Sequence, residues 1–441
     1  MKKELSVFDS TCIIVGIIIG AGIYETAPAV ASSVSGWWGV LGLWAFGGLL
    51  SLAGALCYAE LATAYPYDGG DYVYLSRAYG RWAGFLFGWV QLVVVRPGYI
   101  ALVAFVFARY AGALLGPVLI AESSGRYSQV IYAGAAVLIL TIVNILGVRE
   151  GKWTQNILTI IKVAGLAAIL VAALTGPPAS ATDTQAEVSE PLPVSAALIL
   201  ILFTFGGWNE VAYVAAEVKN PRRNILRSVL AGMAAVTVLY LLANVAFLRA
   251  LGHAGMANSE AVASDMLEAA FPRFGGRIIS ALICISALGT VNGLIFTGSR
   301  ISYAVGAEHR LFRLLGRWDE QRGTPVWALV LQGGIALAMI VVLGSFRRTI
   351  LYTAAAVYAF YLATSVSVII LRWKEPDTER PYKVTGYPLT TIVFGACCAL
   401  LVYSALVYNL RDAAICCAIL LGGVPVYWLS NIGDSGGCGS R

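Results

Sequence analysis

Apolar stretches of about 20 residues follow one another along almost the whole chain, and a helix of that length crosses the hydrocarbon core of a bilayer. Only 12% of the 441 residues are charged and 59% are apolar, whereas an average soluble domain has about 25% charged residues. A soluble fold of this size could not cover its surface with so few charges. The sequence therefore predicts an all-α integral membrane protein.

Twelve windows are apolar enough to be transmembrane helices, near residues 8–32, 37–62, 82–111, 130–149, 155–175, 194–217, 226–250, 274–302, 325–344, 348–372, 388–408 and 412–430. An even number puts both termini on one side of the membrane. Loops on that side hold 20 of the 30 Lys and Arg residues, and loops on the other side hold 8. Because cytoplasmic loops are enriched in Lys and Arg, we expect a multi-pass protein of the cell (inner) membrane with cytoplasmic termini. The basic loops also carry acidic residues, so topology explains them better than a nucleic-acid or anionic-lipid site. The expected partners are an amino-acid substrate and membrane lipid, not nucleic acid.

Glycines interrupt two of these spans. The first contains Gly16, Gly20 and Gly22, and the sixth contains the pair Gly206-Gly207. Each glycine weakens a helix by about 1 kcal/mol relative to alanine, at a depth where unpaired backbone groups are expensive. The spacing of Gly16 and Gly20 also fits a close-packing motif between helices, which is the alternative interpretation of the first span.

The two interruptions correspond to each other. Aligning Gly22 with Gly207 also aligns Glu25 with Glu210, and the two spans lie five apart, as in an inverted repeat of five plus five helices. Matched glycine-interrupted spans point to the midplane substrate site of a transporter. Each break exposes amides suited to an anion and carbonyls suited to a cation, so the expected substrate is a zwitterion, an α-amino acid.

The ordered motifs resemble those of the amino acid-polyamine-organocation (APC) superfamily, and most closely its L-type amino-acid transporter (LAT) family. The resemblance covers nearly the whole chain and rests on Gly20-Ala21-Gly22-Ile23, Tyr65-Pro66-Tyr67-Asp68-Gly69-Gly70-Asp71-Tyr72, Arg96-Pro97, Gly206-Gly207-Trp208-Asn209, Glu217-Val218-Lys219-Asn220-Pro221, Val291-Asn292-Gly293-Leu294-Ile295-Phe296, Thr324-Pro325-Val326 and Glu379-Arg380-Pro381-Tyr382-Lys383-Val384.

This resemblance implies the LeuT-type fold, in a single transporter domain over residues 1–430. Repeat one would cover about 8–175, repeat two about 194–372, and two peripheral helices about 388–430, followed by a disordered tail at 431–441. It also implies sodium-independent transport of L-amino acids by alternating access, by exchange or by facilitated uptake.

The resemblance further implies the roles of individual residues. The amides of Gly20, Ala21 and Gly22 would bind the substrate carboxylate, and the carbonyls of Ile18 and Phe203 would bind its ammonium group. The Phe203 ring would act as the outer gate. The predicted substrate-binding set is completed by Phe205, Gly206 and Gly207.

The chain departs from the family pattern in three places. Ala21 stands where many relatives have Ser, and Glu25 stands where they usually have an apolar residue. The loop between spans 3 and 4 has no Cys, whereas animal members use a Cys there to bind an accessory glycoprotein. We therefore expect a free-standing, prokaryote-like carrier without a disulfide-linked accessory subunit.

Four charged residues are predicted to lie deep in the membrane, namely Glu25, Arg96, Lys162 and Glu210. A charge at that depth needs a partner or backbone carbonyls. In the resembling family a lysine at the position of Lys162 stands where sodium-coupled relatives hold a cation, beside Thr290 or Ser286. For Arg96 we expect a structural ion pair.

Glu25 and Glu210 leave two interpretations open. Each follows a break by three residues, where a carboxylate stabilises the N-terminus of the second half-helix. Alternatively, they pair with a cationic substrate or carry a proton. Proton-coupled uptake of cationic amino acids or amines is thus one alternative function, and a non-transporting amino-acid sensor is another.

The remaining polar segments predict smaller features. Glu60 and Glu217 close spans near the basic side. Either could join Arg77 or Arg300 in an inner-gate network, and a solvated helix end is the alternative interpretation of both. A short helix over 72–79 capped by Asp71, and an outer helix over 259–270 that could cover the vestibule, are also predicted. The sequence has no Cys/His cluster, phosphate loop or nucleophile elbow, so we expect no cofactor, metal or catalytic residue.

Overall fold

The computed structural model describes residues 3–116, 124–175, 192–270, 275–343, 346–408 and 410–431. Regular structure in these ranges is helical apart from two isolated bridges, Leu5 with Val218 and Asp319 with Thr324. The helices are α1 Val7–Ile18, α2 Gly22–Ser33, α3 Gly36–Ala64, α4 Asp71–Tyr79, α5 Arg81–Val90, η1 Gln91–Val95, α6 Arg96–Leu115, α7 Ser124–Leu146, α8 Val148–Thr175, α9 Val194–Thr204, α10 Glu210–Tyr213, η3 Ala215–Glu217, α11 Pro221–Ala257, α12 Val262–Ala270, α13 Gly275–Glu308, η4 Arg310–Phe312, α14 Val326–Leu343, α15 Phe346–Lys374, α16 Leu389–Tyr408 and α17 Leu410–Asn431.

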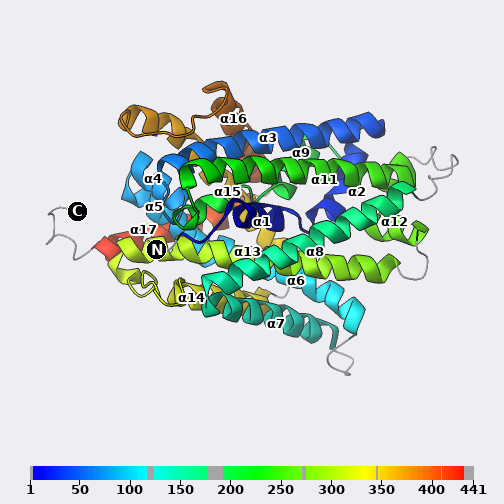
Figure 1. Cartoon of the computed structure of the whole chain (residues 1–441), viewed down its shortest axis with the longest axis horizontal. Coiled ribbons are helices and arrows are strands. Elements are labelled where there is room, and N and C mark those ends of the chain that lie inside the picture. The colour runs from blue at the N-terminus through cyan, green and yellow to red at the C-terminus, as the bar shows by residue number, and fades with distance from the viewer. Residues whose placement is uncertain are drawn as a thin grey trace.

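The long helices lie side by side as a bundle (Figure 1), and the N-terminus and the end of α17 lie at the same end of it. In the described ranges, seven helices are long and apolar enough to cross a membrane, and the bent pair α1 and α2 makes up to eight. Four shorter apolar helices accompany them, Val194–Thr204, Val326–Val342, Leu389–Ser404 and Cys417–Ser430. Helices or broken helices thus occupy all of the predicted windows.

The helix α13 forms the centre of the bundle. It packs against α1, α6 and α8, and most residues of its most apolar stretch are buried inside the protein. The C-terminal helices lie outside, with α16 against α3 and α15, and α17 against α5 and α15. Helices 1 and 6 of the predicted series are both interrupted, as α1 and α2 and as α9 and α10.

A π-helical turn, η1, precedes α6 at Gln91–Val95. Its cause is local, because Pro97 has no N–H to donate to the turn before it. Such turns often occur at functional sites. Here the turn and the residues after it, Gln91, Val95 and Arg96, line a cavity described below.

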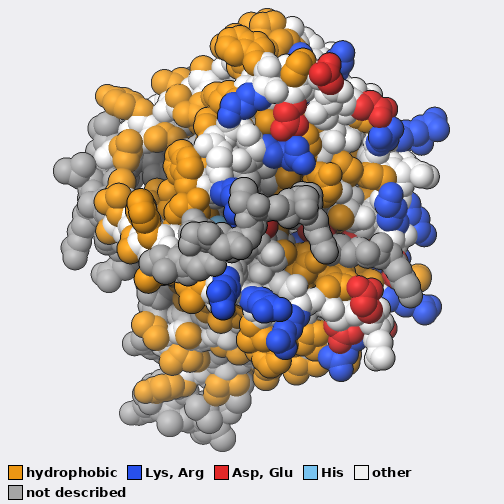
Figure 2. Space-filling model, turned by 90° about the vertical axis from the view of Figure 1, so that its left-hand side faces the viewer, with side chains coloured by type: hydrophobic (Ala, Val, Ile, Leu, Met, Phe, Trp, Pro, Cys, Tyr) orange, Lys and Arg blue, Asp and Glu red, His pale blue; other side chains and the backbone are white. Residues whose placement is uncertain are grey.

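Charged residues gather at the end of the bundle that is formed by α4, the start of α11 and the end of α13, which we call the basic end. Figure 2 faces this end and shows Lys and Arg side chains together with Asp and Glu, bordered by hydrophobic side chains. Two main-chain hydrogen bonds here join the segment before α1 to the segment between η3 and α11. The Leu5 amide donates to Glu217 O at 3.0 Å, and the Lys219 amide donates to Leu5 O at 2.8 Å.

Two predicted short helices are present, with one correction. The helix α12 buries Val262 and Met266 against its neighbours. The helix α4 begins at Asp71, but the Asp71 side chain does not cap it. That carboxylate instead accepts hydroxyl hydrogen bonds from other helices, because α4 is buried between them. The predicted tail and the outer loop around 179–193 fall almost entirely outside the described residues.

Candidate functional site

The first break separates α1 and α2, which are bent by 54° relative to each other. The helix α1 ends at Ile18 and α2 begins at Gly22. Among the described residues, no acceptor takes a hydrogen bond from the amides of Gly20, Ala21 and Gly22. Free amides at the positive end of a helix dipole suit a carboxylate.

The second break follows α9, where residues 205–209 form turns before the short α10. Gly207 has φ +121°, and a Cβ on it would lie 2.8 Å from the Ile17 Cγ2 atom. This position requires glycine both for its backbone angle and because α1 approaches so closely. The two breaks are therefore in direct contact.

Hydroxyl groups bridge the two breaks. Tyr240 of α11 donates to Ile18 O at 2.9 Å and lies 3.4 Å from Thr204 O. The hydroxyls of Thr26 and Thr204 are 2.9 Å apart. Carbonyls that the interrupted helices leave open are thus partly satisfied by side chains, as a buried break requires.

The ammonium group of Lys162, on α8, is bound entirely by backbone carbonyls. Its Nζ atom lies 2.7 Å from Gly16 O, 2.6 Å from Ile19 O and 3.0 Å from Ser286 O, and the residue is 1% exposed. These contacts use all three of its donors. Lys162 therefore joins the end of α1 to the centre of α13.

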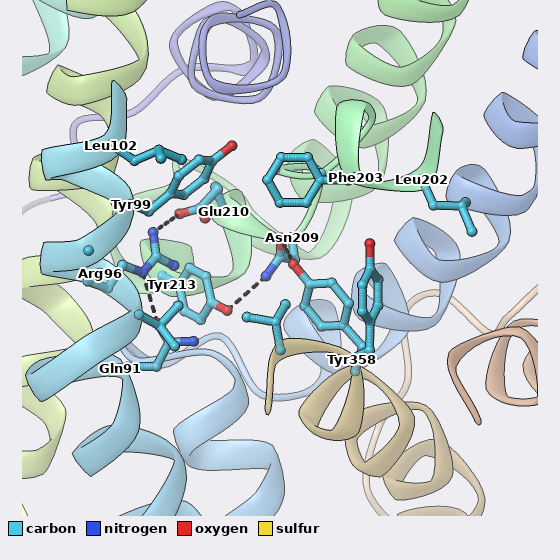
Figure 3. Close-up of a pocket in the computed structure, with 16 residues that line it drawn as sticks. Gln91, Arg96, Tyr99, Leu102, Leu202, Phe203, Asn209, Glu210, Tyr213 and Tyr358 are labelled. Carbon is cyan, nitrogen blue, oxygen red and sulfur yellow. Dashed lines mark hydrogen bonds and ion pairs between the residues drawn. The ribbon is translucent and has the colours of Figure 1, made fainter. Parts of the chain in front are cut away.

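A cavity of about 90 Å³ lies beside the second break (Figure 3). Its walls come from η1 and α6, from the second broken helix and from α15. Most are aromatic or aliphatic, and the lining residues are Gln91, Val95, Arg96, Gly98, Tyr99, Leu102, Leu202, Phe203, Gly206, Gly207, Asn209, Glu210, Tyr213, Val357, Tyr358 and Tyr361.

The two charges of this cavity are paired with each other. The Arg96 Nη1 atom lies 2.9 Å from the Glu210 Oε2 atom, and Thr297 donates to the same oxygen at 2.5 Å. Arg96 also donates to Gln91 at 3.2 Å and lies over the Tyr213 ring, 4.8 Å from its centroid. Both ionic side chains are buried. The pair leaves the cavity wall without net charge.

Comparison with known proteins agrees with this geometry. The family model described as "Amino acid permease" matches residues 5–421. The chain belongs to the amino acid permease family, within the APC superfamily. This permease is 30% identical to the mouse "b(0,+)-type amino acid transporter 1" over 97% of its own length and 88% of the relative. It is 32% identical to the human "Large neutral amino acids transporter small subunit 2" over 97% of its own length and 80% of the relative.

The permease is thus a multi-pass membrane protein of a family of amino acid transporters. Of its predicted site residues, Phe203, Gly206, Gly207 and Glu210 line the cavity. The Phe203 ring lies 6.2 Å from the Tyr99 ring between centroids. The predicted site residues that line the cavity are therefore the glycine pair of the second break and the residues on either side of it.

The residues predicted at the first break lie behind that wall. Ile18, Gly20, Ala21 and Gly22 do not line the cavity, although a Cβ on Gly207 would lie 3.2 Å from the Ile18 Cγ1 atom. The helices around the break therefore put its free amides next to the cavity rather than in its wall.

Both α13 hydroxyls predicted near Lys162 are there. Thr290 Oγ1 lies 3.3 Å from Gly16 O, and Ser286 Oγ donates to Ile19 O at 2.9 Å. Each hydroxyl thus contacts a carbonyl that Lys162 also binds.

Two expectations need correction. Phe205 is fully buried against Trp44 and Tyr240, with ring centroids 6.0 and 5.1 Å away. Positions two apart on a helical turn face different sides, so Phe203 and Phe205 cannot both face one cavity. Glu25 is not enclosed within the protein, since its side chain is 45% exposed and pairs with Arg109 at 3.0 Å.

Sequence reasoning missed the wall contributed by α6 and α15. Tyr99, Leu102, Tyr358 and Tyr361 line the cavity but carry no charge or glycine signal. Part of this wall was readable once Arg96 was singled out, because Gln91, Val95, Tyr99 and Leu102 follow helical spacing on one face. The α15 tyrosines come from a helix far along the chain and show no such relation in sequence.

At the basic end, ion pairs hold the helices together. Arg300 pairs with Glu217 at 2.7 Å, and both side chains are almost fully buried. Arg77, the other predicted partner, forms a partly exposed pair with Glu375 at 3.2 Å, and Glu60 pairs with Arg372 at 2.6 Å. These contacts join η3, α4, α13 and the end of α15.

A second cavity, of about 740 Å³, opens at the basic end. It is lined by Tyr67, Asp68, Tyr72, Val73, Ser76, Arg77, Ala216, Tyr303, Ala304, Ala307 and Glu308. Asp68, in the loop between α3 and α4, has no hydrogen-bond partner for either carboxylate oxygen within the described ranges. Burial, together with the nearby Glu217 carboxylate, raises the pKa of Asp68 to about 8.

Proposed function

We propose that this permease exchanges L-amino acids across the cell membrane by alternating access, without sodium. The proposal includes a LeuT-type arrangement of twelve spans, with the basic end in the cytoplasm. Matched breaks in the first and sixth helices support the inverted repeat. The loops on the side of the termini hold 20 Lys and Arg residues and those on the other side hold 8, which supports the orientation.

The observation that carries the proposal is the contact between the two breaks. Gly20, Ala21 and Gly22 offer three free amides at the N-terminus of a 12-residue helix. The carbonyls of Ile18 and Phe203 lie at the ends of the first half-helices, and each already accepts one bond, from Tyr240 and from the Gly206 amide. A carbonyl oxygen has a second lone pair. An α-carboxylate and an α-ammonium group therefore find complementary backbone partners side by side.

The tail of the substrate would enter the cavity beside Phe203. Because Arg96 and Glu210 neutralise each other, a cationic or anionic tail would find no free counter-charge there. The apolar and tyrosine walls favour a neutral tail, and the name of one relative refers to large neutral amino acids. Neutral α-amino acids are therefore the proposed substrates.

Lys162 supports sodium independence. Its ammonium group is held by carbonyls of α1 and α13, the helices that would otherwise share a bound cation. A covalently fixed charge makes a diffusible ion unnecessary at this place. The Phe203 ring, above the cavity, would close the outer side, and the Glu217–Arg300 pair would close the inner side.

Reconstituted protein tests the proposal. Proteoliposomes loaded with unlabelled leucine should take up radiolabelled leucine faster than empty ones, equally well in sodium and in choline buffers. A panel of labelled neutral, cationic and acidic amino acids should be transported in the order neutral, cationic, acidic. Uptake that requires a proton gradient and prefers cationic substrates would replace this proposal by the proton-coupled alternative, and saturable binding without flux would indicate a sensor.

A further inference from the structure

A buried carboxylate outside the substrate cavity connects that cavity to the basic end. Asp71, the first residue of α4, is fully buried. Its carboxylate accepts hydrogen bonds from Tyr58 of α3, Tyr213 of α10 and Thr364 of α15. A single side chain of α4 thus holds three other helices, although nothing in the transport chemistry proposed above uses it.

One of these bonds leads back to the substrate cavity. Tyr213 donates to the Asp71 Oδ2 atom at 2.6 Å and accepts from the Asn209 Nδ2 atom at 2.8 Å (Figure 3 shows the latter bond). Tyr361 in turn donates to the Asn209 Oδ1 atom at 3.2 Å. Asn209, Tyr213 and Tyr361 all line the cavity. The floor of the substrate cavity is therefore one hydrogen bond away from α4.

The direction of these bonds is fixed. An ionised carboxylate only accepts, and an amide nitrogen only donates, so the Tyr213 hydroxyl has to receive from Asn209 and donate to Asp71. A substrate tail that binds the side-chain oxygen or nitrogen of Asn209 moves this amide group. The hydrogen bond that the Asn209 nitrogen donates to the Tyr213 hydroxyl then changes. Hydrogen bonds in such a chain strengthen one another, so a change at one end is felt at the other.

Two further side chains of α4, one beside Asp71 and one near its C-terminal end, tie it to the basic end. Tyr72 donates to Glu308 at 2.8 Å, and Arg77 pairs with Glu375 at 3.2 Å, which ties α4 to the ends of α13 and α15. The backbone of the preceding turn contributes as well, since the Gly69 amide donates to Tyr213 O at 3.2 Å. Movement of α4 would break these contacts together.

We propose that Asp71 is a positioning residue that couples occupancy of the amino-acid cavity to the position of α4, through Asn209 and Tyr213. This inference rests on the proposed function, since it presumes that an amino acid occupies the cavity. It adds a connection between substrate recognition and the closure of the basic end.

Two substitutions interrupt the chain without removing a side chain from the core. Asp71→Asn keeps an oxygen for Tyr58 and Thr364, which both bind Oδ1, but presents an amide group to Tyr213, whose hydroxyl then has no acceptor. Tyr213→Phe removes the hydroxyl and keeps the ring. The matched control is Tyr58→Phe, which removes a bond to the same carboxylate from a residue that does not line the cavity.

The readout is the accessibility of α4. Ser76, on α4, lines the basic-end cavity and its hydroxyl oxygen is buried, so Ser76→Cys is a nearly isosteric reporter for a membrane-impermeant thiol reagent added at the basic end. Labelling of the same protein without this cysteine is subtracted. Equilibrium binding of radiolabelled leucine is measured on every variant.

With the native Asp71, saturating leucine should change the labelling rate of Cys at position 76 by at least about fivefold, the lower end of typical coupling between sites. At the leucine concentration that saturates each variant in the binding measurement, the change should be less than about twofold in Asp71→Asn and Tyr213→Phe, whereas Tyr58→Phe should keep the full response. If Asp71→Asn and Tyr213→Phe bind leucine and still show the full change in labelling rate, the proposed coupling is wrong, but the proposed function is not affected. If Asp71→Asn does not fold, Tyr213→Phe decides. Absence of binding to the unmodified chain would overturn the proposed function, and this inference with it.

Discussion

Lys162 offers the sharpest test of how the first break is held. Substituting methionine removes the ammonium group and keeps a side chain of similar length, so no large cavity forms. The loss is three hydrogen bonds from a charged donor, to Gly16 O, Ile19 O and Ser286 O. Bonds of this kind contribute about 1.5–3 kcal/mol each, and the desolvation of a buried ammonium offsets several kcal/mol of the sum.

The remaining contacts limit the damage. Ser286 still donates to Ile19 O, and Thr290 remains close to Gly16 O, so two of the three carbonyls keep a hydroxyl neighbour. We therefore expect a net loss of about 1.5–3 kcal/mol in the arrangement that joins α1 to α13, which corresponds to roughly 10- to 100-fold in rate. Expression should persist, as it should for Lys162→Ala.

The assay is the initial rate of leucine counterflow in proteoliposomes, compared at equal amounts of monodisperse protein. Ser286→Ala is the matched control, because it removes a neutral donor from the same carbonyl and should lower the rate only about 2- to 10-fold. Counterflow by Lys162→Met at the rate of the unmodified protein would refute the reasoning. So would a Ser286→Ala variant that is slower than Lys162→Met.

Three further predictions concern the two ion pairs, the second break and the basic end. Glu210→Gln leaves Arg96 buried without a counter-charge, so it should lower the free energy of unfolding of the detergent-purified protein by about 3–5 kcal/mol, measured as a lower Tm. Glu25→Gln removes one partner of an exposed pair and should change this free energy by less than about 1 kcal/mol. Gly207→Ala should lower leucine affinity sharply, because its φ of +121° and the close approach of α1 both exclude a Cβ. The control is Gly42→Ala, which should leave leucine affinity unchanged because no atom lies within 4 Å of the added Cβ. Asp68→Asn should remove a pH dependence of the basic end. Because burial raises the pKa of Asp68 from 3.8 to about 8, the arrangement that buries this carboxyl is favoured at low pH and is lost as the pH at the basic end rises toward 8.

Each of these has a result that contradicts it. Equal Tm values for the two glutamine variants would mean that the buried pair contributes no more than the exposed one. Leucine binding by Gly207→Ala with unchanged affinity would show that α1 moves away to make room for the Cβ, which contradicts the prediction. For Asp68, labelling of the Ser76→Cys reporter should rise between about pH 6 and pH 8.5 with the native carboxylate, and the same rise in Asp68→Asn would assign it to another group.

The order of the helices could be predicted because membrane spans depend on local composition. Runs of apolar residues locate a helix without reference to its neighbours, so helices occupy the predicted windows. The breaks were also readable, since glycine pairs weaken a helix in its own sequence. The π-helical turn before Arg96 was not predicted, because Pro97 removes one N–H from the helix but does not by itself decide between a kink and a π-helical turn.

The positions of the two helix breaks at the candidate site could be predicted from the sequence, but most of the side chains that line the cavity could not. Glu25 and Glu210 occupy equivalent positions after the two breaks, yet only Glu210 is buried, because α6 brings Arg96 to it. Arg109 of the same helix meets Glu25 near the surface instead. Tertiary packing, which sequence spacing does not contain, decides which of two similar carboxylates belongs to the cavity.

The main-chain bridge between Leu5 and the segment after η3 has a practical consequence. Its two amide protons, on Leu5 and Lys219, are protected only while the segment before α1 and the segment after η3 stay together. Their exchange with deuterated solvent therefore reports how often the basic end opens, without any label or substitution. Added amino acid should change this exchange rate.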